Sequence, residues 1–246
     1  MSLTRTFAVA RRVLNQLAHD HRTLGLLFVV PPLLIALLKY VFEHQVREFN
    51  ALAPMLLGIF PMVMMFLVTS IATLRERTSG TLDRLMTMPM AKADFIFGYA
   101  LAFALLAIVQ ASIASAVMLG LLGVTVLGGT LATLIGAVLA ALLGTALGLF
   151  ASAFAASEFQ AVQFMPAFLF PQLLTCGLFV ARDQMAKLLQ WFADIMPLTY
   201  SVDAMKQVTV HAGWTTSHSH DLIVVGAYTV AALVLASITI RRQQKA

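Results

Sequence analysis

The chain has 246 residues, of which 60% are hydrophobic and only 11% are charged, and its formal net charge is +5. A soluble domain is about half apolar and a quarter charged, so this composition excludes a soluble globular protein and an intrinsically disordered one. Cys176 is the only cysteine, which excludes an intrachain disulfide scaffold. The composition therefore predicts an integral membrane protein.

Residues 3–17 form the first predicted element, ahead of the long apolar runs. Apolar side chains recur there at steps of three and four residues: Leu3, Phe7, Ala10, Leu14 and Leu17. Arg11 and Arg12 fall at other positions, so the pattern predicts an amphipathic helix in the membrane interface. The first apolar run begins only at Thr23, is long enough to span a bilayer and follows this basic segment, so we expect no cleavable signal peptide.

Six membrane-spanning helices are predicted, because each crossing needs about 20 apolar residues. The expected spans are approximately residues 23–42, 53–74, 95–121, 130–156, 159–181 and 222–240. Lys39 fits within the first span if its side chain reaches outward. The charge-free interval between Asp94 and Glu158 is too long for one crossing, and we place its turn at Gly128-Gly129. We find no internal repeat or linker, so residues 1–246 are treated as one all-α domain.

Lysine and arginine are unevenly divided between the two faces that six spans create. The face with both termini carries eleven: Arg5, Arg11, Arg12, Arg22, Arg75, Arg77, Arg84, Lys92, Arg241, Arg242 and Lys245. The other face carries five: Lys39, Arg47, Arg182, Lys187 and Lys206. Basic residues concentrate on the cytoplasmic side, so both termini are predicted to be cytoplasmic. Their position at the edges of apolar runs favours this topological role over nucleic-acid binding.

The cytoplasmic connection from Arg75 to Asp94 carries a short amphipathic pattern. Thr78 or Ser79 can cap a helix that Pro89 ends. The apolar stripe of this helix consists of Leu82, Leu85 and Met86. From the residues alone, two interpretations stay open: a helix that docks into a groove of a soluble partner, and a solvated hairpin that rests on lipid.

The outer connection from Arg182 to Asp221 is the second long loop. One helical face is apolar and comprises Met185, Leu188, Leu189, Phe192 and Ile195. Trp191 is typical of an interface anchor, and Pro197 is expected to break the helix. This periodicity is compatible with a helix that lies flat on the outer leaflet.

The fourth span carries small residues at strict four-residue steps: Ala132, Gly136, Ala140, Gly144, Gly148, Ser152 and Ala156. Small residues allow another helix to approach closely, so this stripe predicts helix packing. The sequence does not distinguish a neighbour in the same chain from one in a second copy.

Two segments resemble one family of membrane proteins. Residues Glu76–Leu85, followed by Met88-Pro89-Met90 and a long apolar helix, resemble the signature loop of type-2 membrane domains of ABC (ATP-binding cassette) exporters. Residues Leu189–Phe192 and Met196–Met205 resemble the stretch before the last span of the same family. With the six-span layout, the resemblance covers essentially the whole chain and is closest to bacterial drug- and antibiotic-export permeases.

The resemblance implies that the cytoplasmic loop is a coupling helix seated in a partner ATPase. The implied coupling residues are Glu76, Arg77, Gly80, Thr81, Leu82, Asp83, Arg84 and Leu85. The leucines are expected to bury, and the charged side chains to lie at the rim and shape specificity. The resemblance also implies two ATPase copies, a second permease copy or a sister permease, a re-entrant helical pair capping the outer end, and a bacterial inner-membrane location.

The chain lacks the sequence pattern of an ATPase. A phosphate-binding loop requires G-x-x-x-x-G-K-[ST], and none of the five lysines follows a glycine. We therefore expect no enzymatic activity and no cofactor in this chain, with ATP and Mg²⁺ bound by a separate ATPase subunit. His211, His218 and His220 near Asp221 are a conceivable metal site, but their Ser/Thr-rich setting favours a solvated loop without metal.

The candidate substrate path combines thioether, aromatic and amide side chains of spans 2 and 5, the spans that line the cavity in similar exporters. The candidates are Phe60, Met64, Met65, Gln163, Phe164 and Phe168. Such side chains suit amphipathic molecules, although the same residues could simply face lipid or fill packing gaps. Pro61, Pro166 and Pro171 are expected to kink these spans.

Glu158 is predicted to lie at the inner mouth of span 5. A carboxylate deep in a membrane is costly and usually functional, so Glu158 is a candidate gate. At the end of an apolar run it could instead simply reach water.

The sequence thus predicts the permease subunit of an ATP-driven exporter for a drug- or lipid-like amphipathic substrate. The alternative is an ion-coupled secondary transporter, which would be expected to carry titratable residues inside its spans. An intramembrane enzyme is disfavoured, because no G-x-S-x-G, H-E-x-x-H or paired intramembrane aspartate occurs.

Overall fold

The computed structural model describes residues 3–79 and 92–243. Its elements in chain order are α1 (Leu3–Ala18), α2 (His21–Val41), α3 (Val46–Thr78), α5 (Lys92–Ala116), the π-helical turn η1 (Val117–Leu121), α6 (Thr130–Ser152), α7 (Glu158–Thr175), the 3-10 turn η2 (Arg182–Gln184), α8 (Lys187–Ile195), α9 (Pro197–Val210) and α10 (Thr216–Gln243). No strand occurs among the described residues, and the prediction of an all-α membrane protein is confirmed.

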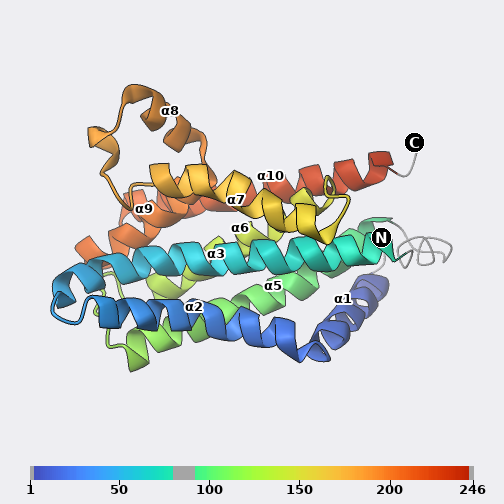
Figure 1. The fold of residues 1–246 in the computed structure, drawn as a ribbon, viewed down its shortest axis with the longest axis horizontal. Helices are drawn as coiled ribbons and strands as arrows, with labels where there is room; N and C mark the ends of the chain where they lie inside the picture. The colour runs from blue at the N-terminus through green and yellow to red at the C-terminus, as the bar shows by residue number, and fades with distance from the viewer. Residues whose placement is uncertain (1–2, 80–91, 244–246) are drawn as a thin grey trace.

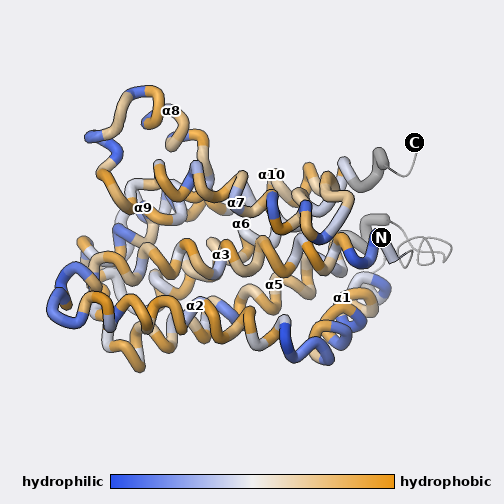
Figure 2. Tube along the Cα trace, in the orientation of Figure 1, coloured by the Kyte–Doolittle hydropathy of each residue, from blue (hydrophilic) through white to orange (hydrophobic). Residues whose placement is uncertain are grey.

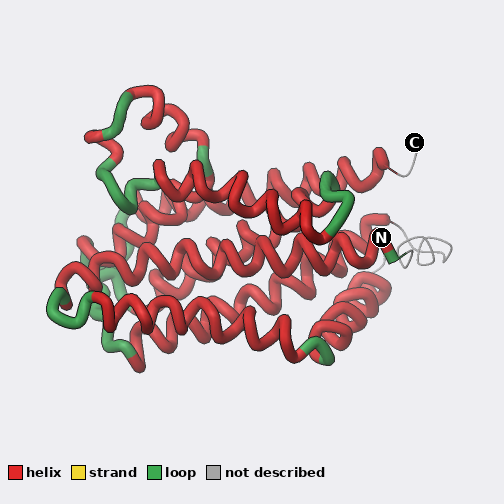
Figure 3. The backbone as a smooth tube through the Cα atoms, viewed as in Figure 1, coloured by secondary structure: helices red, strands yellow, loops and turns green. Residues whose placement is uncertain are grey.

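The long helices run side by side along the longest dimension of the molecule (Figure 1). Both chain termini lie at one end, together with α1, and we call this the terminal end. The turn between α2 and α3 and the pair α8–α9 lie at the opposite end, here called the distal end. Figure 2 shows apolar residues along the long helices and polar residues in α1 and the turns. Figure 3 places most of the loops at the two ends of the bundle, as expected for a chain that crosses a membrane repeatedly.

Five helices of the described part of the chain are long and apolar enough to cross a membrane: α2, α3, α5 with η1, α6 and α10. The remaining predicted span corresponds to α7, which has 18 residues and runs along α3. α7 contains no 18-residue stretch as apolar as those of the other five, because its 18 residues include Glu158 and three glutamines. A sixth crossing therefore remains a prediction, although both termini lie at the same end of the bundle.

The bounds of α3 and α6 differ from the predicted spans 53–74 and 130–156. α3 extends to Val46 and Thr78, so it continues past the charges that were expected to end it. It can do so because those charges lie in its terminal turns, where they reach the surface or an ionic partner. α6 ends earlier than predicted, at Ser152, whose hydroxyl donates to the Leu149 carbonyl within the last turn.

The bounds of α7 and α10 also differ from the predictions 159–181 and 222–240. α7 ends at Thr175, because the chain turns away at Gly177, whose φ of +88° is accessible to glycine at little cost. α10 begins earlier than predicted, at Thr216, where the Thr215 hydroxyl accepts a hydrogen bond from the backbone N–H of His218. Apolar run length predicted neither boundary because local capping sets both.

α3 is the central helix, and the small residues of α6 allow its close approach. In its most apolar 18-residue stretch, 67% of the α3 residues are buried, compared with 22% for the corresponding stretch of α2. A Cβ built on Gly148 of α6 would lie 2.6 Å from the carbonyl oxygen of Phe66, and one on Gly144 would overlap the Met62 carbonyl. Gly144 and Gly148 of the small-residue stripe therefore pack against α3 of the same chain, whereas a Cβ on Gly136 would lie 2.6 Å from Met205 Sδ of α9.

α1 is amphipathic as predicted, but its buried face is rotated from the expected one. Ala10 and Leu17 are buried, whereas Phe7 is 61% exposed and Val9 and Val13 are buried instead. A Cβ on Gly98 of α5 would lie 2.6 Å from Val9, so α1 packs closely on α5. Periodicity located α1 correctly, but packing against α5 decides which face of α1 is buried.

Candidate functional site

The base of the predicted coupling loop is held by Glu76, in the last turn of α3. This residue is only 4% exposed, and Arg12 Nη2 of α1 lies 2.8 Å from its Oε1 and 2.9 Å from its Oε2. A buried carboxylate requires such a partner, since an unpaired charge in this position is very costly. Glu76 therefore joins α3 to α1, and its side chain points into the protein rather than outward.

The residues on either side of Glu76 contact two further helices. Arg75 Nε lies 2.7 Å from Glu158 Oε1, and Arg75 Nη2 lies 3.0 Å from Glu158 Oε2, so α3 is paired with the first residue of α7. Arg77 Nη1 donates a hydrogen bond to the carbonyl oxygen of Ser152 at the end of α6. Successive residues on a helix point about 100° apart, which is why three consecutive side chains reach α7, α1 and α6.

The remaining predicted coupling residues lie outside the described part of the chain. They are Gly80, Thr81, Leu82, Asp83, Arg84 and Leu85. The structure thus describes only the base of this loop, up to Ser79, which follows the C-terminus of α3.

The candidate gate residue Glu158 is the first residue of α7, and its pairing with Arg75 in the last turn of α3 places it at the terminal end of the bundle. It follows Ser157, whose hydroxyl caps α7 by accepting from the backbone N–H of Gln160. The Glu158 side chain is 50% exposed and that of Arg75 is 54% exposed. Water and ions screen such a pair, so its energetic contribution to stability is small, about 0–1 kcal/mol.

Two apolar hollows flank α7. The phenylalanine hollow lies between α3, α6 and α7, has a volume of about 350 Å³, and is lined by Phe66, Leu147, Phe150, Ala151, Phe154, Phe164, Ala167 and Phe168. The aliphatic groove lies mainly between α2, α3 and α7 and has a volume of about 640 Å³. It is lined by Leu34, Leu38, Phe42, Leu52, Leu56, Ile59, Phe60, Val63, Met165, Leu169, Phe170, Leu173, Leu178, Phe179 and Leu198.

The substrate-path candidates are divided among several places rather than gathered in one. Phe164 and Phe168 line the phenylalanine hollow, whereas Phe60 lines the aliphatic groove. Met64 lines a third hollow of about 190 Å³ that α1, α2, α3 and α5 share.

The other two candidates differ sharply in burial. Met65 has no exposed surface, and Gln163 is exposed. Met64 and Met65 are one position apart, yet one lines a hollow and the other is completely buried, and the substrate path stays a prediction.

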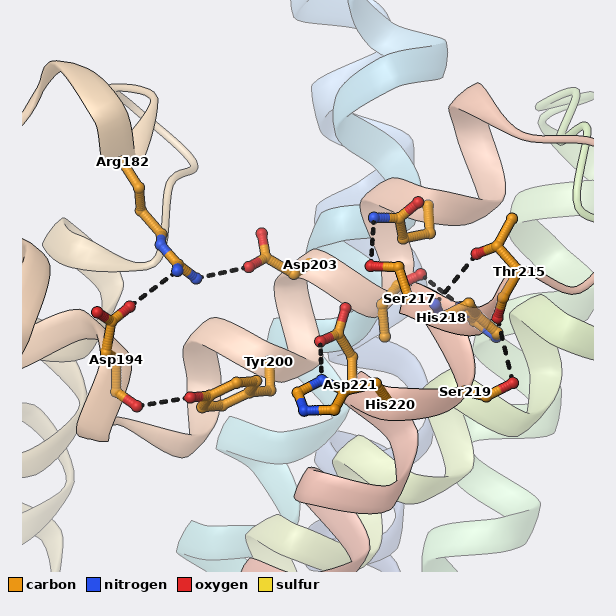
Figure 4. Close-up of polar contacts among 12 residues, drawn as sticks. Arg182, Asp194, Tyr200, Asp203, Thr215, Ser217, His218, Ser219, His220 and Asp221 are labelled. Carbon is orange, nitrogen blue, oxygen red and sulfur yellow. Dashed lines mark hydrogen bonds and ion pairs between the residues drawn. The ribbon is translucent and has the colours of Figure 1, made fainter.

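A polar cluster occupies the distal end, where Arg182 bridges α8 and α9 (Figure 4). Its Nη2 lies 2.8 Å from Asp194 Oδ1, and its Nη1 lies 2.8 Å from Asp203 Oδ2. The Tyr200 hydroxyl donates to the Asp194 carbonyl oxygen at 2.7 Å. Burial raises the pKa of the Asp203 carboxyl, and the neighbouring Arg182 opposes this shift. The cluster fastens α8, a helix whose apolar face is largely exposed, to the rest of the protein.

The helical pair predicted around Pro197 is present, with α8 ending at Ile195 and α9 starting at Pro197. Leu198 on α9 is buried, whereas Trp191 on α8 is 70% exposed. α9 packs against α3, α6 and α10, and α8 projects from the side of the bundle (Figure 1).

Two of the three histidines considered for a metal site, His218 and His220, make local side-chain contacts. His218 is buried, and its Nδ1 lies 3.0 Å from the Ala204 carbonyl oxygen (Figure 4). His220 Nδ1 lies 3.3 Å from Asp221 Oδ1. Within the ranges that the structure describes, no three His, Cys, Asp or Glu side chains are placed to hold one ion.

Sequence reasoning missed the partners of these charged groups. The pairs Arg12–Glu76 and Arg182–Asp203 join residues that are 64 and 21 positions apart, so no local pattern reveals them. An available signal was the isolated aspartate in the otherwise uncharged first nine residues of α9, because a buried acidic side chain requires a cation or hydrogen-bond donor.

Comparison with known proteins agrees with this architecture. A family model described as ABC-2 type transporter matches residues 4–210. "ABC transporter G family member 20" of Dictyostelium discoideum is 26% identical over 157 residues, which cover 64% of this chain and 22% of that protein. "Probable multidrug ABC transporter permease YbhR" of Escherichia coli strain K12 is 26% identical over 155 residues, which cover 63% of this chain and 42% of that protein. The matched region therefore spans less than half the length of either relative.

Proposed function

This chain belongs to the ABC-2 type transporter family, and on that premise we propose that it is the permease subunit of an ATP-driven exporter for an amphipathic drug- or lipid-like substrate. Family membership and the membrane-spanning helices support a membrane subunit of an ABC transporter. ATP and Mg²⁺ bind to two copies of a separate ATPase subunit, and a second permease copy or a sister permease completes the path. The terminal end faces the cytoplasm of a bacterial cell, since the Lys/Arg excess lies there.

The observation that carries this proposal is the attachment of the loop base to three helices. Arg75, Glu76 and Arg77 contact α7, α1 and α6, respectively. A displacement of the loop base therefore alters contacts with three helices at once. This is the mechanical property that a coupling segment requires, because an ATPase can shift the permease only through contacts that differ between its states.

α7 is the element that responds in this mechanism. The Arg75–Glu158 contact connects it to the loop base, and Pro166 and Pro171 interrupt its hydrogen-bond ladder, so that it can bend. The phenylalanine hollow and the aliphatic groove lie on its two sides and include Phe60, Phe164 and Phe168. Movement of α7 would change access to both hollows, with Glu158 acting as the gate at the cytoplasmic mouth.

The first test concerns ATPase binding by the loop. In the combined variant Asp83→Arg, Arg84→Asp and Leu85→Asp, co-purification of the ATPase is expected to fall by about tenfold or more, since a central apolar contact and two rim charges are lost. The matched control is Leu188→Asp, a change on α8 at the distal end, where the side chain is 76% exposed. The control should retain the ATPase. Equal retention of the ATPase by the loop variant, with an unchanged unfolding temperature, would overturn this role of the loop.

The second test separates coupling from binding. Glu158→Gln should lower transport in reconstituted vesicles while the ATPase remains bound, and the exchange Arg75→Glu with Glu158→Arg should restore transport. Transport by the chain alone under a pH gradient, without ATPase or ATP, would instead favour the ion-coupled alternative.

A further inference from the structure

The phenylalanine hollow differs from the rest of the apolar surface in its composition. Five of its eight lining residues are phenylalanines, against four of fifteen in the aliphatic groove. None of the eight carries a polar side chain. Its volume of about 350 Å³ falls in the range of small-molecule pockets, about 300–1,000 Å³. The hollow is therefore large enough for a ring system and chemically distinct from a surface suited to acyl chains.

The hollow opens sideways, between α6 and α7, near the terminal end. Phe154, just after α6, is 52% exposed, and Phe168 on α7 is 39% exposed. α6 and α7 pack little against each other, so the two helices leave an opening that α3 closes at the back. Ser152 and Glu158 contact Arg77 and Arg75 at the base of the loop. In the sequence they lie close to the lining residues of the segment 147–154. Under the proposed topology the opening therefore lies at the depth of the cytoplasmic leaflet.

The walls of the hollow present aromatic rings in two different orientations. Phe66 and Phe168 are stacked, with centroids 6.4 Å apart and an interplanar angle of 11°. Phe150 and Phe154 meet edge to face, with centroids 5.1 Å apart and an angle of 76°. Aromatic pairs favour offset-stacked and edge-to-face contacts, so an additional ring finds partners of both kinds here. A saturated chain is stabilised in the hollow only by the burial of its apolar surface, whereas a ring gains the additional aromatic pair contacts.

The charges around the hollow indicate which part of a ligand it takes. No lining residue carries a formal charge or a polar side chain, so an uncharged ring enters the hollow without the desolvation cost of an enclosed ion. At the terminal end Arg75 is paired with Glu158, and Arg77 donates to the Ser152 carbonyl. A polar head group can remain at this wet end while the ring enters the hollow.

We propose that the phenylalanine hollow is a binding site for the uncharged aromatic ring system of an amphipathic molecule that enters from the cytoplasmic leaflet. The site lies within one subunit, because α3, α6 and α7 of a single chain form it. Its identification as a site for transported cargo rests on the proposed function, whereas the binding itself does not.

The test uses the full chain in phospholipid nanodiscs without the ATPase. Benzophenone-4-methanol serves as an aromatic photolabel, and peptide mass spectrometry locates the adducts. Biphenyl-4-methanol and its ring-saturated analogue bicyclohexyl-4-methanol are matched competitors of similar size. We expect adducts on the segments 147–154 and 164–168, and competition by the aromatic compound at concentrations at least about threefold lower than by the saturated one.

Two variants and one control test the assignment of the residues. Phe154→Leu and Phe168→Leu should each weaken labelling about threefold to tenfold, which corresponds to the loss of one aromatic pair contact. Phe170→Leu, on the same helix but lining the aliphatic groove, should leave labelling unchanged. Equal competition by the saturated analogue, or equal effects of all three variants, would overturn the proposal.

The outcome is distinguishable from failure of the proposed function. Loss of aromatic selectivity with intact ATPase binding would remove this site and leave the permease assignment in place. Selective labelling by a chain that never binds an ATPase would keep the site and remove the permease assignment.

Discussion

The close approach of α6 to α3 leads to a sharp prediction about Gly148. A Cβ at this position would lie 2.6 Å from the carbonyl oxygen of Phe66 and 3.1 Å from Cβ of Thr69. The first of these atoms belongs to the backbone, so no side-chain rotation can relieve the overlap. The variant Gly148→Ala therefore forces the two central helices apart.

The expected magnitude combines two opposing effects. Overpacking a well-packed contact costs about 1–3 kcal/mol. Replacing a glycine by alanine within a helix contributes about 0.5–1 kcal/mol in the other direction. The two ranges combine to a net loss of about 0–2.5 kcal/mol, centred near 1 kcal/mol, in the free energy of unfolding of Gly148→Ala.

The assay is unfolding of the purified protein in detergent micelles, with Gly226→Ala as the matched control. Gly226 lies in α10, and nothing lies within 4 Å of an added Cβ there. The control should be as stable as the parent protein or slightly more stable. If Gly148→Ala proved no less stable than Gly226→Ala, the inferred contact between α6 and α3 would be wrong.

Three further predictions concern polar contacts. Arg12→Ala should destabilise the protein by about 2–3 kcal/mol in unfolding assays, because it leaves the Glu76 carboxylate buried without its ionic partner, and Arg12→Leu combined with Glu76→Leu should recover most of the loss. Asp20 caps α2, and hydrogen bonds from the hydroxyl and the backbone N–H of Thr23 lower its pKa, so its contribution is present at neutral pH and is lost as the pH falls below about 4. Thermal unfolding as a function of pH should show this loss for the parent protein but not for Asp20→Asn, which keeps the cap, and Asp20→Ala should cost about 1 kcal/mol at neutral pH. Arg182→Ala should accelerate hydrogen exchange of the α8 backbone amides, whereas exchange as slow as in the parent protein would show that the Arg182 bridge does not hold α8.

Much of the architecture was predictable because it depends on local properties of the chain. Charge-free run length located the five helices that can span a membrane, and the three- and four-residue steps located α1. Pro197 predicted the break between α8 and α9, since proline lacks the N–H that would continue a helix. The small-residue stripe of α6 predicted tight packing, which the contacts of Gly144 and Gly148 confirm.

The candidate site was less predictable, because its geometry depends on residues far apart in the chain. Composition identified α3 and α7 as carriers of aromatic and thioether side chains, yet Met64 faces a hollow and Met65 is completely buried. Side chains one position apart on a helix point about 100° away from each other, so only the neighbouring helices decide which of them meets a cavity.

Membrane class, helix positions and the distribution of charge thus follow from the order of the amino acids, because water, lipid and backbone geometry act on each segment separately. The choice of α3 as the partner of α6, the pairing of Arg12 with Glu76 and the division of apolar side chains into two hollows beside α7 arise only when the helices pack. They are set by which surfaces fit together at close range, and that fit is a property of the assembled bundle.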